Sequence, residues 1–395
     1  MTVQDTLQAV RAHEDEFIAL RRDIHQHPEL PFEELRTSDL VAARLRDWGY
    51  HVERGLGGTG VVGQLKRGDG KRTLGLRADM DALPIQETTG LQYASRNQGV
   101  MHACGHDGHT AMLLAAAKVL AEQGDFSGTL NLIFQPAEEY GTSDCGAVRM
   151  INDGLFDKYP CDAIFSMHNM PGWPQGHLIF REGPMMASSD KVYITLVGHG
   201  GHGAVPHKTA DPVVAAASLV MALQTVVSRN VDPLQTAVVT VGVLQSGRAN
   251  NVIPDSAYLE LSVRALDSEV RSLLQQRITE IAHAQAQSFG VKAEIDYRRG
   301  YAALVNSKDE TDFARQIGTE LVGAERVVPQ APPLTGSEDF AFMLEKCPGS
   351  YLLIGNGDGD KLGACMVHNP GYDFNDANLA IGAAYWTLLA RRYLV

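Results

Sequence analysis

The middle of the chain has a different pattern of strands and helices from the segments on either side of it. Residues 187–300 predict the order strand, helix, strand, strand, helix, strand, which is the ferredoxin-like pattern. In the flanking segments short apolar runs alternate with helical periodicities, which is typical of an α/β layer built on a mostly parallel sheet. We therefore predict an α/β domain formed by residues 1–186 and 301–395, and an α+β domain inserted at residues 187–300.

The assignments within the α/β segments come from the spacing of apolar residues and from turn residues. Residues 61–65 and 73–77 flank an Arg-Gly-Asp-Gly sequence that is typical of a turn, so we expect these two strands to pair as a hairpin. The other assignments are helices at 7–24, 41–48 and 112–120, and interior strands at 130–135, 163–167 and 351–354.

Composition excludes several classes of protein. The 395 residues are 44% hydrophobic and 21% charged, which is ordinary for a globular chain and unlike a disordered or fibrous one. The net charge of −13 makes nucleic acid a poor partner. The longest apolar runs, at 111–121 and 213–223, are shorter than the roughly 20 residues that a bilayer requires, so we expect no membrane association. No secretory signal is visible, and five cysteines in a chain of this length form no disulfide framework, so we expect a cytoplasmic protein.

The segment 101–109 is rich in metal-binding side chains, with three histidines, a cysteine and an aspartate. Cys104 and His106 lie one residue apart in a loop that contains glycine, and thiolate and imidazole are preferred donors for zinc-like ions. A structural zinc site would usually include a Cys-x-x-Cys pair, which this sequence lacks. The density of donors therefore favours a functional metal site over a structural one or a polar helix cap.

Two adjacent carboxylates, Glu138 and Glu139, follow the strand predicted at 130–135. Adjacent carboxylates normally lie on a solvated face. In the first turn of a helix, however, neighbouring side chains diverge by about 100°, so one can bind a metal ion while the other faces its water. That division of roles is what metal-assisted hydrolysis requires.

Other polar residues also follow predicted strands. Asp79 and Asp81 come after the strand that ends at residue 77, a pattern that is also typical of a solvated turn. His168 ends another strand, and His368 lies near the C-terminus; a single histidine is more often structural than a ligand. Open α/β sheets place their functional sites at the carboxyl ends of strands, so the position of these residues favours a role in the site.

The inserted segment carries its own polar residues. His202 lies in a glycine-rich stretch at 198–207 that is also typical of a flexible surface loop. Asn251 and Arg264 are isolated polar residues in this segment. Arg264 could pair with a substrate carboxylate in bidentate fashion, although a structural salt bridge is the commoner role.

Taken together, these motifs resemble the M20 metallopeptidase family, over nearly the whole chain from Arg22 to His368. Within that family the resemblance is to the amidohydrolase branch, which includes hippurate hydrolases, N-acyl-amino-acid aminoacylases, N-acetyldiaminopimelate deacetylases and auxin-conjugate hydrolases. The motifs are Arg-Ala-Asp-Met-Asp-Ala-Leu-Pro, Met-His-Ala-Cys-Gly-His-Asp-Gly-His-Thr, Gln-Pro-Ala-Glu-Glu, Gly-Gly-His-Gly-Ala-Val-Pro-His, Asn-Val-Ile-Pro-Asp and Gly-Ser-Glu-Asp-Phe.

The resemblance implies a site for two divalent metal ions, with Glu138 as the general base and acid. The ligands it implies are Cys104, His106, Glu139, His168 and His368. In the wider family an aspartate beside a histidine ligand orients that ligand; Asp81 stands at the aspartate position, and Asp79 stands where the histidine would be. We therefore expect Asp81 to orient a ligand, and we assign no role to Asp79. The donor set accepts zinc, manganese, cobalt or nickel and does not choose among them.

For the inserted domain, the resemblance implies contacts with the substrate and a homodimer interface. His202, Asn251 and Arg264 match positions that contact the substrate carbonyl oxygen or carboxylate in the family, and the family's histidine can act across the subunit boundary. The turn at Gly336 and Ser337 is a further candidate for holding the carboxylate. The sequence departs from the family at 246–250, where Ser-Gly-Arg-Ala-Asn replaces the usual Gly-Gly, and Lys191 and Arg248 add positive charge.

The expected activity is hydrolysis of an N-acyl amino acid by metal-activated water, yielding a carboxylic acid and an amino acid. Two alternatives belong to other classes. In one, Cys104 is a nucleophile activated by a histidine, which would leave the roles of Glu139, His168 and His368 unexplained. In the other, the chain is a catalytically silent binding protein that keeps the fold and a metal.

Overall fold

The computed structural model describes residues 2–395 and divides into two compact units. The first unit comprises the residues up to Gly183 together with Val305–Pro332 and Asp339–Val395, and the second comprises Pro184–Leu304 and Pro333–Glu338. The short segment 333–338 thus groups with the second unit, although the sequence places it in the α/β domain. The chain passes between the units four times: in the short strands β7 (Gly183–Met186) and β14 (Leu304–Asn306), and at each end of the segment 333–338.

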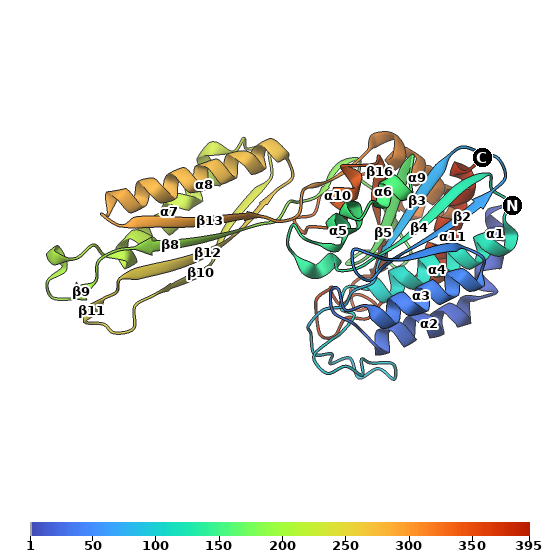
Figure 1. The fold of residues 1–395 in the computed structure, drawn as a ribbon, viewed down its shortest axis with the longest axis horizontal. Coiled ribbons are helices and arrows are strands. Elements are labelled where there is room, and N and C mark those ends of the chain that lie inside the picture. Colours follow the sequence, from blue (N-terminus) through green and yellow to red (C-terminus); the bar gives the residue numbers. More distant parts are fainter. Residues whose placement is uncertain (1) are drawn as a thin grey trace. The chain divides into compact units, whose positions relative to one another are not determined.

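The first unit is an α/β fold around an eight-stranded mixed sheet (Figure 1). Across the sheet the strands are β1 (His51–Leu56), β2 (Gly60–Arg67), β4 (Gly128–Gln135), β3 (Thr73–Asp79), β5 (Ala163–Pro171), β16 (Gly349–Gly357), β6 (Leu178–Ile179) and β15 (Val327–Val328). The four central strands from β4 to β16 are parallel, whereas β2 is antiparallel to β4 and β6 is antiparallel to β16. The predicted parallel character therefore holds for the four central strands, where the site residues lie, and for the short edge pair of β6 and β15.

The predicted hairpin between residues 61–65 and 73–77 is wrong, because β4 lies between β2 and β3. β2 instead forms a tight hairpin with β1, and two glycines with positive φ, Gly57 and Gly58, lie in the turn. After β2 the chain packs on the start of β4. There the Gly70 amide donates to Ser127 Oγ (2.9 Å) and the Thr129 amide donates to the Arg72 carbonyl (2.9 Å). This packing carries the chain past β4 before it enters β3.

Helices cover both faces of this sheet. One continuous core joins alternate strand residues to six helices: α1 (Val3–Arg11), α2 (Glu14–Gln26), α3 (Leu35–Asp47), α4 (His106–Gln123), α9 (Lys308–Val322) and α11 (Asn378–Tyr393). The other helices of the unit are α5 (Gly146–Asn152), α6 (Leu155–Lys158), α10 (Phe340–Leu344) and the 3₁₀ turns η1 (Glu138–Tyr140) and η3 (Ala324–Arg326). The helix predicted at 7–24 is thus two helices, α1 and α2.

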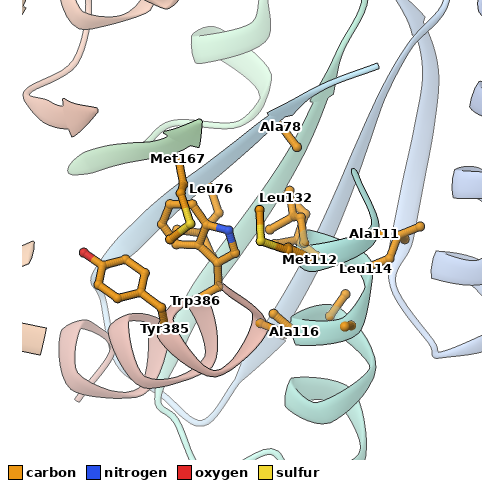
Figure 2. Close-up of a cluster of buried hydrophobic side chains, with 14 of the residues drawn as sticks. Leu76, Ala78, Ala111, Met112, Leu114, Ala116, Leu132, Met167, Tyr385 and Trp386 are labelled. Carbon is orange, nitrogen blue, oxygen red and sulfur yellow. The ribbon is translucent and has the colours of Figure 1, made fainter. Parts of the chain in front are cut away.

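The centre of this core lies where α4 and α11 pack against the sheet. Figure 2 shows Trp386 of α11 between Met167 of β5 and Met112 of α4, all of them almost completely buried. Burial of one large apolar side chain contributes about 1.5–3 kcal/mol to stability. Because α4 is held by this packing along its length, its first turn, which carries His106, has a fixed position on the sheet.

The second unit contains the six predicted elements in the predicted order. They are β8 (Asp190–Val197), α7 (Pro212–Asn230), β10 (Ala237–Ser246), β12 (Ser256–Ala265), α8 (Ser268–Ser288) and β13 (Lys292–Arg299). The four strands form an antiparallel sheet in the order β10-β12-β8-β13, and α7 and α8 pack together on it around a separate apolar core (Figure 1). The aspartates that precede the two helices, Asp211 and Asp267, accept hydrogen bonds from their first-turn amides and so fix where each helix begins.

Within residues 2–395, only α7 is long and apolar enough to cross a membrane by length and composition. One face of α7 packs in the core of the second unit through Ala215, Leu219 and Leu223. Much of the remaining apolar surface is exposed, including Val214 and Met221. The helix is therefore a core element of the second unit with a large exposed apolar face.

Candidate metal centre

The candidate site begins where the loop 101–105 enters α4. Gly105 precedes the helix in a left-handed conformation (φ 89°). A Cβ at this position would lie 2.2 Å from Asn169 Nδ2 and 2.4 Å from the Tyr372 hydroxyl, so only glycine fits without displacing its neighbours. This turn places Cys104 and His106 side by side above the carboxyl ends of the parallel strands, as expected for an open α/β sheet.

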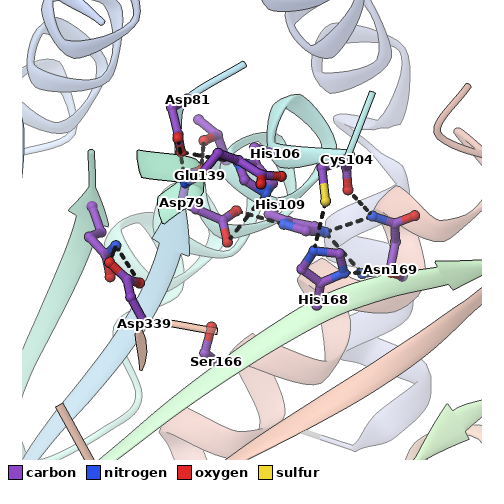
Figure 3. Close-up of polar contacts among 12 residues, drawn as sticks. Asp79, Asp81, Cys104, His106, His109, Glu139, Ser166, His168, Asn169 and Asp339 are labelled. Carbon is purple, nitrogen blue, oxygen red and sulfur yellow. Dashed lines mark hydrogen bonds and ion pairs between the residues drawn. The ribbon is translucent and has the colours of Figure 1, made fainter. Parts of the chain in front are cut away.

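The structure brings together all five residues that the sequence predicts as metal ligands. Cys104 Sγ lies 3.3 Å from His168 Nε2, and His368 Nε2 lies 2.9 Å from Glu139 Oε1 (Figure 3 shows the first of these contacts). Three overlapping groups have donor atoms that all lie within 4.8 Å of one another: Cys104 with His106 and His168, Cys104 with Glu139 and His368, and His106 with Glu138 and Glu139. Cys104, His106 and Glu139 each belong to two of these groups, so the three groups form one continuous donor cluster.

The histidines of this cluster are held so that one ring nitrogen faces inward. His106 Nδ1 donates to Asp81 Oδ1 (3.2 Å), and His168 Nδ1 donates to the Asn169 carbonyl (2.5 Å). His106 Nε2 is buried and has no hydrogen-bond partner among the described residues. A buried nitrogen without a partner costs stability, whereas a divalent cation would satisfy it. The donor chemistry and this orphan nitrogen both fit a metal site.

Glu138 and Glu139 lie in the 3₁₀ turn η1, which follows β4 directly. The preceding residue, Ala137, is in a left-handed conformation (φ 51°, ψ 45°). Asp81 Oδ2 accepts the backbone amide of Glu139 (2.8 Å), so the same carboxylate holds both this turn and His106. Asp81 therefore lies where the sequence predicts a residue that orients a ligand.

Without a cation, burial and the neighbouring charged side chains decide which groups of the cluster carry a proton. Burial, together with the carboxylates of Glu139 and Glu138, raises the pKa of the Cys104 thiol well above its usual value. Burial lowers the pKa of His106, but Asp79 and Asp81 outweigh it and raise that pKa to about 10. Metal ligands must be deprotonated, so the cluster acquires its ligand form only together with a cation.

The predicted substrate residues lie in the second unit as two local pairs. His202 ends the short strand β9 (Gly201–His202), and Asn251 directly precedes β11 (Val252–Ile253), which pairs with β9. The Gly203 amide donates to the Asn251 carbonyl (2.8 Å), so the two residues lie close together. Arg264 on β12 donates to Ser337 Oγ (3.1 Å). Gly336, beside Ser337, accepts a hydrogen bond from the Ala187 amide (2.8 Å).

A model of peptidase family M20/M25/M40 matches residues 75–392. A hippurate hydrolase from Campylobacter jejuni is 47% identical over 379 residues, which cover 96% of this chain and 97% of that protein. The chain belongs to peptidase family M20. Membership of this family, together with the similarity to a hippurate hydrolase, shows that the chain is a hydrolase that acts on amide bonds.

Two further comparisons place it within M20. An N-acetyl-L-cysteine deacetylase from Bacillus subtilis is 40% identical over 374 residues, covering 94% of this chain and 86% of that protein. The crystal structure of the Bacillus subtilis YXEP protein, described as a dinuclear metal binding peptidase of the M20 family, has a TM-score of 0.82 at 33% identity and covers 97% of this chain and 99% of that one. These relatives place the chain in the amidohydrolase branch of M20, as the motifs predict.

The structure gives this M20 chain a role for Asp79, to which the sequence assigned none. Asp79 Oδ1 accepts from His109 Nδ1 (2.7 Å), and Arg77 Nη1 donates to Asp79 Oδ2 (2.7 Å; Figure 3 shows this region). Although burial opposes it, His106, His109 and Arg77 hold the pKa of Asp79 well below its usual range. Asp79 therefore remains a carboxylate that carries negative charge beneath the donor cluster.

The sequence interpretation also missed the residues that hold His109 and the base of the site. The backbone amide of Asn169 donates to His109 Nε2 (2.9 Å), and His109 Nδ1 donates to Asp79. Both ring nitrogens of His109 therefore have hydrogen-bond partners within the protein, so the ring supports the site rather than offering a nitrogen to a metal ion. Arg77 also donates to Gln135 Oε1 (2.9 Å) and Asp339 Oδ1 (3.1 Å). The placement of Asp79, Gln135 and Asn169 at strand ends was the signal that could have revealed them.

Proposed function

We propose that the protein is a metal-dependent amidohydrolase that cleaves N-acyl amino acids into a carboxylic acid and a free amino acid. The observation that carries the proposal is the donor cluster of Cys104, His106, Glu139, His168 and His368 with a second carboxylate, Glu138, directly beside it. The similarity to a hippurate hydrolase and to an N-acetyl-L-cysteine deacetylase supports this class of substrate. We propose that the five donors bind two divalent ions, since a related structure is described as dinuclear.

The chemistry divides between the cations and Glu138. When bound, divalent cations supply Lewis acidity, which allows water to ionise near neutral pH. Glu138, which is buried beside the donors, accepts the proton from the attacking water. The water oxygen bonds to the amide carbon, the C–N bond breaks, and Glu138 returns the proton to the departing amine. Asp81 keeps His106 and the backbone of Glu139 in place during these steps.

We propose that the second unit recognises the substrate. His202 accepts the Ala204 amide at Nδ1 (3.0 Å), which leaves Nε2 to donate a hydrogen bond, and with Asn251 it would stabilise the developing oxyanion. Arg264, Ser337 and the Gly336 turn would bind the substrate carboxylate. The contact between Arg264 and Ser337 supports this assignment because it presents a cation and a hydroxyl at one place.

A substrate panel tests the activity. Metal-reconstituted protein is assayed with hippurate, several N-acetyl amino acids, their carboxamide counterparts and unblocked dipeptides. We expect hydrolysis of the N-acyl amino acids and weak hydrolysis of the carboxamides, because these lack the charge that Arg264 would bind. Turnover of the dipeptides alone would indicate a peptidase, and turnover of none would indicate the silent binding protein.

We also propose that residues 187–300 form a ferredoxin-like domain through which two copies of the chain associate. Two features of the second unit support this proposal. β10 is an edge strand of ten residues, and unpaired edges of this length favour pairing with another strand. On α7, the side chains of Val214 and Met221 are 49% and 70% exposed. An apolar helix face beside an open strand edge is suited to a homodimer interface.

Replacing Met221 with lysine tests this interface. The substitution puts a charge in the apolar face of α7, so we expect the dimer to dissociate to monomers in sedimentation velocity at micromolar concentration. Gln276→Lys, which adds the same charge at an exposed residue of α8, serves as the matched control and should leave the dimer intact. A Met221→Lys protein that sediments as the wild type would contradict the proposed interface.

A further inference from the structure

Glu34 is a buried carboxylate that contacts the turn carrying Glu138, although it lies more than 100 residues earlier in the chain. It directly precedes α3, and its side chain is 0% exposed. Oε1 accepts the backbone amide of Ala137 (2.8 Å), and Oε2 accepts the hydroxyl of Thr59 (2.5 Å). Each carboxylate oxygen therefore has a donor, which makes burial of the group tolerable.

The amide that Glu34 holds belongs to a residue in an unfavourable conformation. Ala137 has φ 51° and ψ 45°, and a left-handed conformation costs a non-glycine residue about 1–2 kcal/mol. Such a residue persists only when its surroundings hold it. The Ala137 conformation turns the chain from the end of β4 into η1, and thus sets the direction in which Glu138 and Glu139 project.

Glu34 and Asp81 act on the two sides of Glu138. Glu34 binds the amide of the residue before it, and Asp81 binds the amide of the residue after it. The segment 137–139 is therefore fixed at both ends by buried carboxylates from two distant parts of the chain. Loss of one of these contacts would free the backbone at the position where the expected base and one expected metal ligand are adjacent.

We propose that Glu34 is a positioning residue, which holds the Ala137 turn so that Glu138 and Glu139 face the donor cluster. The inference rests on the proposed function for its catalytic consequence, but its effect on Glu139 concerns metal binding alone. Loss of residues that support metal ligands typically lowers metal affinity or activity by about 10–100-fold.

The test replaces Glu34 with methionine, which keeps the volume of the side chain and removes both acceptors. We expect kcat to fall by about 10–100-fold with little change in KM, and the affinity for Zn²⁺ or Mn²⁺, measured against a competing chelator, to fall over the same range. Glu34→Gln should restore both, because its amide oxygen can accept from Ala137 while its NH₂ group donates to the Thr59 hydroxyl. Burial and the nearby Asp81 raise the pKa of Glu34 to about 7, so its neutral and ionised forms coexist near neutral pH.

Glu33→Met is the matched control, because it removes the same charge from the exposed neighbouring residue, and it should behave as the wild type. Should Glu34→Met fail to fold, Glu34→Asp carries the same test, because its shorter side chain falls short of the Ala137 amide. Wild-type kcat and metal affinity in a folded Glu34→Met or Glu34→Asp protein would overturn the proposal, as would equal losses in Glu34→Gln. If the wild type hydrolyses no N-acyl amino acid, the proposed function fails, but a selective loss of metal affinity in Glu34→Met still supports the role of Glu34.

Discussion

Replacing Glu138 with glutamine is expected to lower turnover by about 100-fold or more while leaving the bound metal in place, which is the usual scale for loss of acid–base catalysis. Glutamine has nearly the same shape as glutamate but cannot accept a proton from water. The carboxylate of Glu138 lies within 4.8 Å of the donor atoms of His106 and Glu139, and we assign it to proton transfer rather than to the five proposed ligands. The substitution therefore separates proton transfer from metal binding.

Initial rates on the best substrate of the panel, with the metal content of the same samples measured by elemental analysis, check this expectation. Glu33→Gln, on an exposed glutamate, is the matched control and should retain full activity. Normal turnover in Glu138→Gln would exclude Glu138 as the base. Loss of metal together with turnover would instead assign Glu138 to the ligands.

Removal of divalent cations is expected to abolish hydrolysis, and their return is expected to restore it. Without a cation the protein would have no activated water, and Cys104 could not take its place as the nucleophile. The thiol of Cys104 is almost completely buried and lies near the carboxylates of Glu138 and Glu139. Its raised pKa keeps it protonated in the absence of a cation, so it is a poor nucleophile by itself.

The comparison of chelation with alkylation separates this account from a thiol hydrolase. Protein dialysed against a chelator and then freed of it should be inactive, and addition of zinc, manganese, cobalt or nickel should recover the rate. Wild-type protein without chelation should lose little activity to a brief treatment with iodoacetamide, since Cys104 is buried and is a ligand in the proposed metal site. A thiol hydrolase would give the opposite pair of results.

The convergence of the five proposed ligands could be predicted from the sequence because each donor follows a strand or lies in a distinctive motif. The carboxyl ends of β3, β4 and β5 meet at one edge of the sheet, which is why residues near 81, 139 and 168 converge. The βαββαβ order of the second unit could also be predicted, since each of its six main elements has its own helix or strand periodicity.

The parts that could not be predicted depend on pairing between distant residues. The order of β2, β4 and β3 depends on how the 68–72 segment packs on Ser127 and Thr129, which local turn residues do not reveal. Glu34 was missed for the same reason, because its partners Thr59 and Ala137 become neighbours only in the folded chain. Asp79 was left without a role because it stands where the resemblance places a histidine, and its contact with His109 forms only in the folded chain.

Stepwise return of metal to stripped protein is the most direct test of a two-cation hydrolase. Aliquots of Zn²⁺ or Mn²⁺ are added to protein of known concentration, and the rate of hippurate or N-acetyl amino acid hydrolysis is recorded after each addition. We expect no turnover at the start and a rate that rises and levels off near two equivalents of metal per chain. Full turnover before any metal is added, or a rate that stays at zero on every N-acyl amino acid with the sites filled, would contradict it.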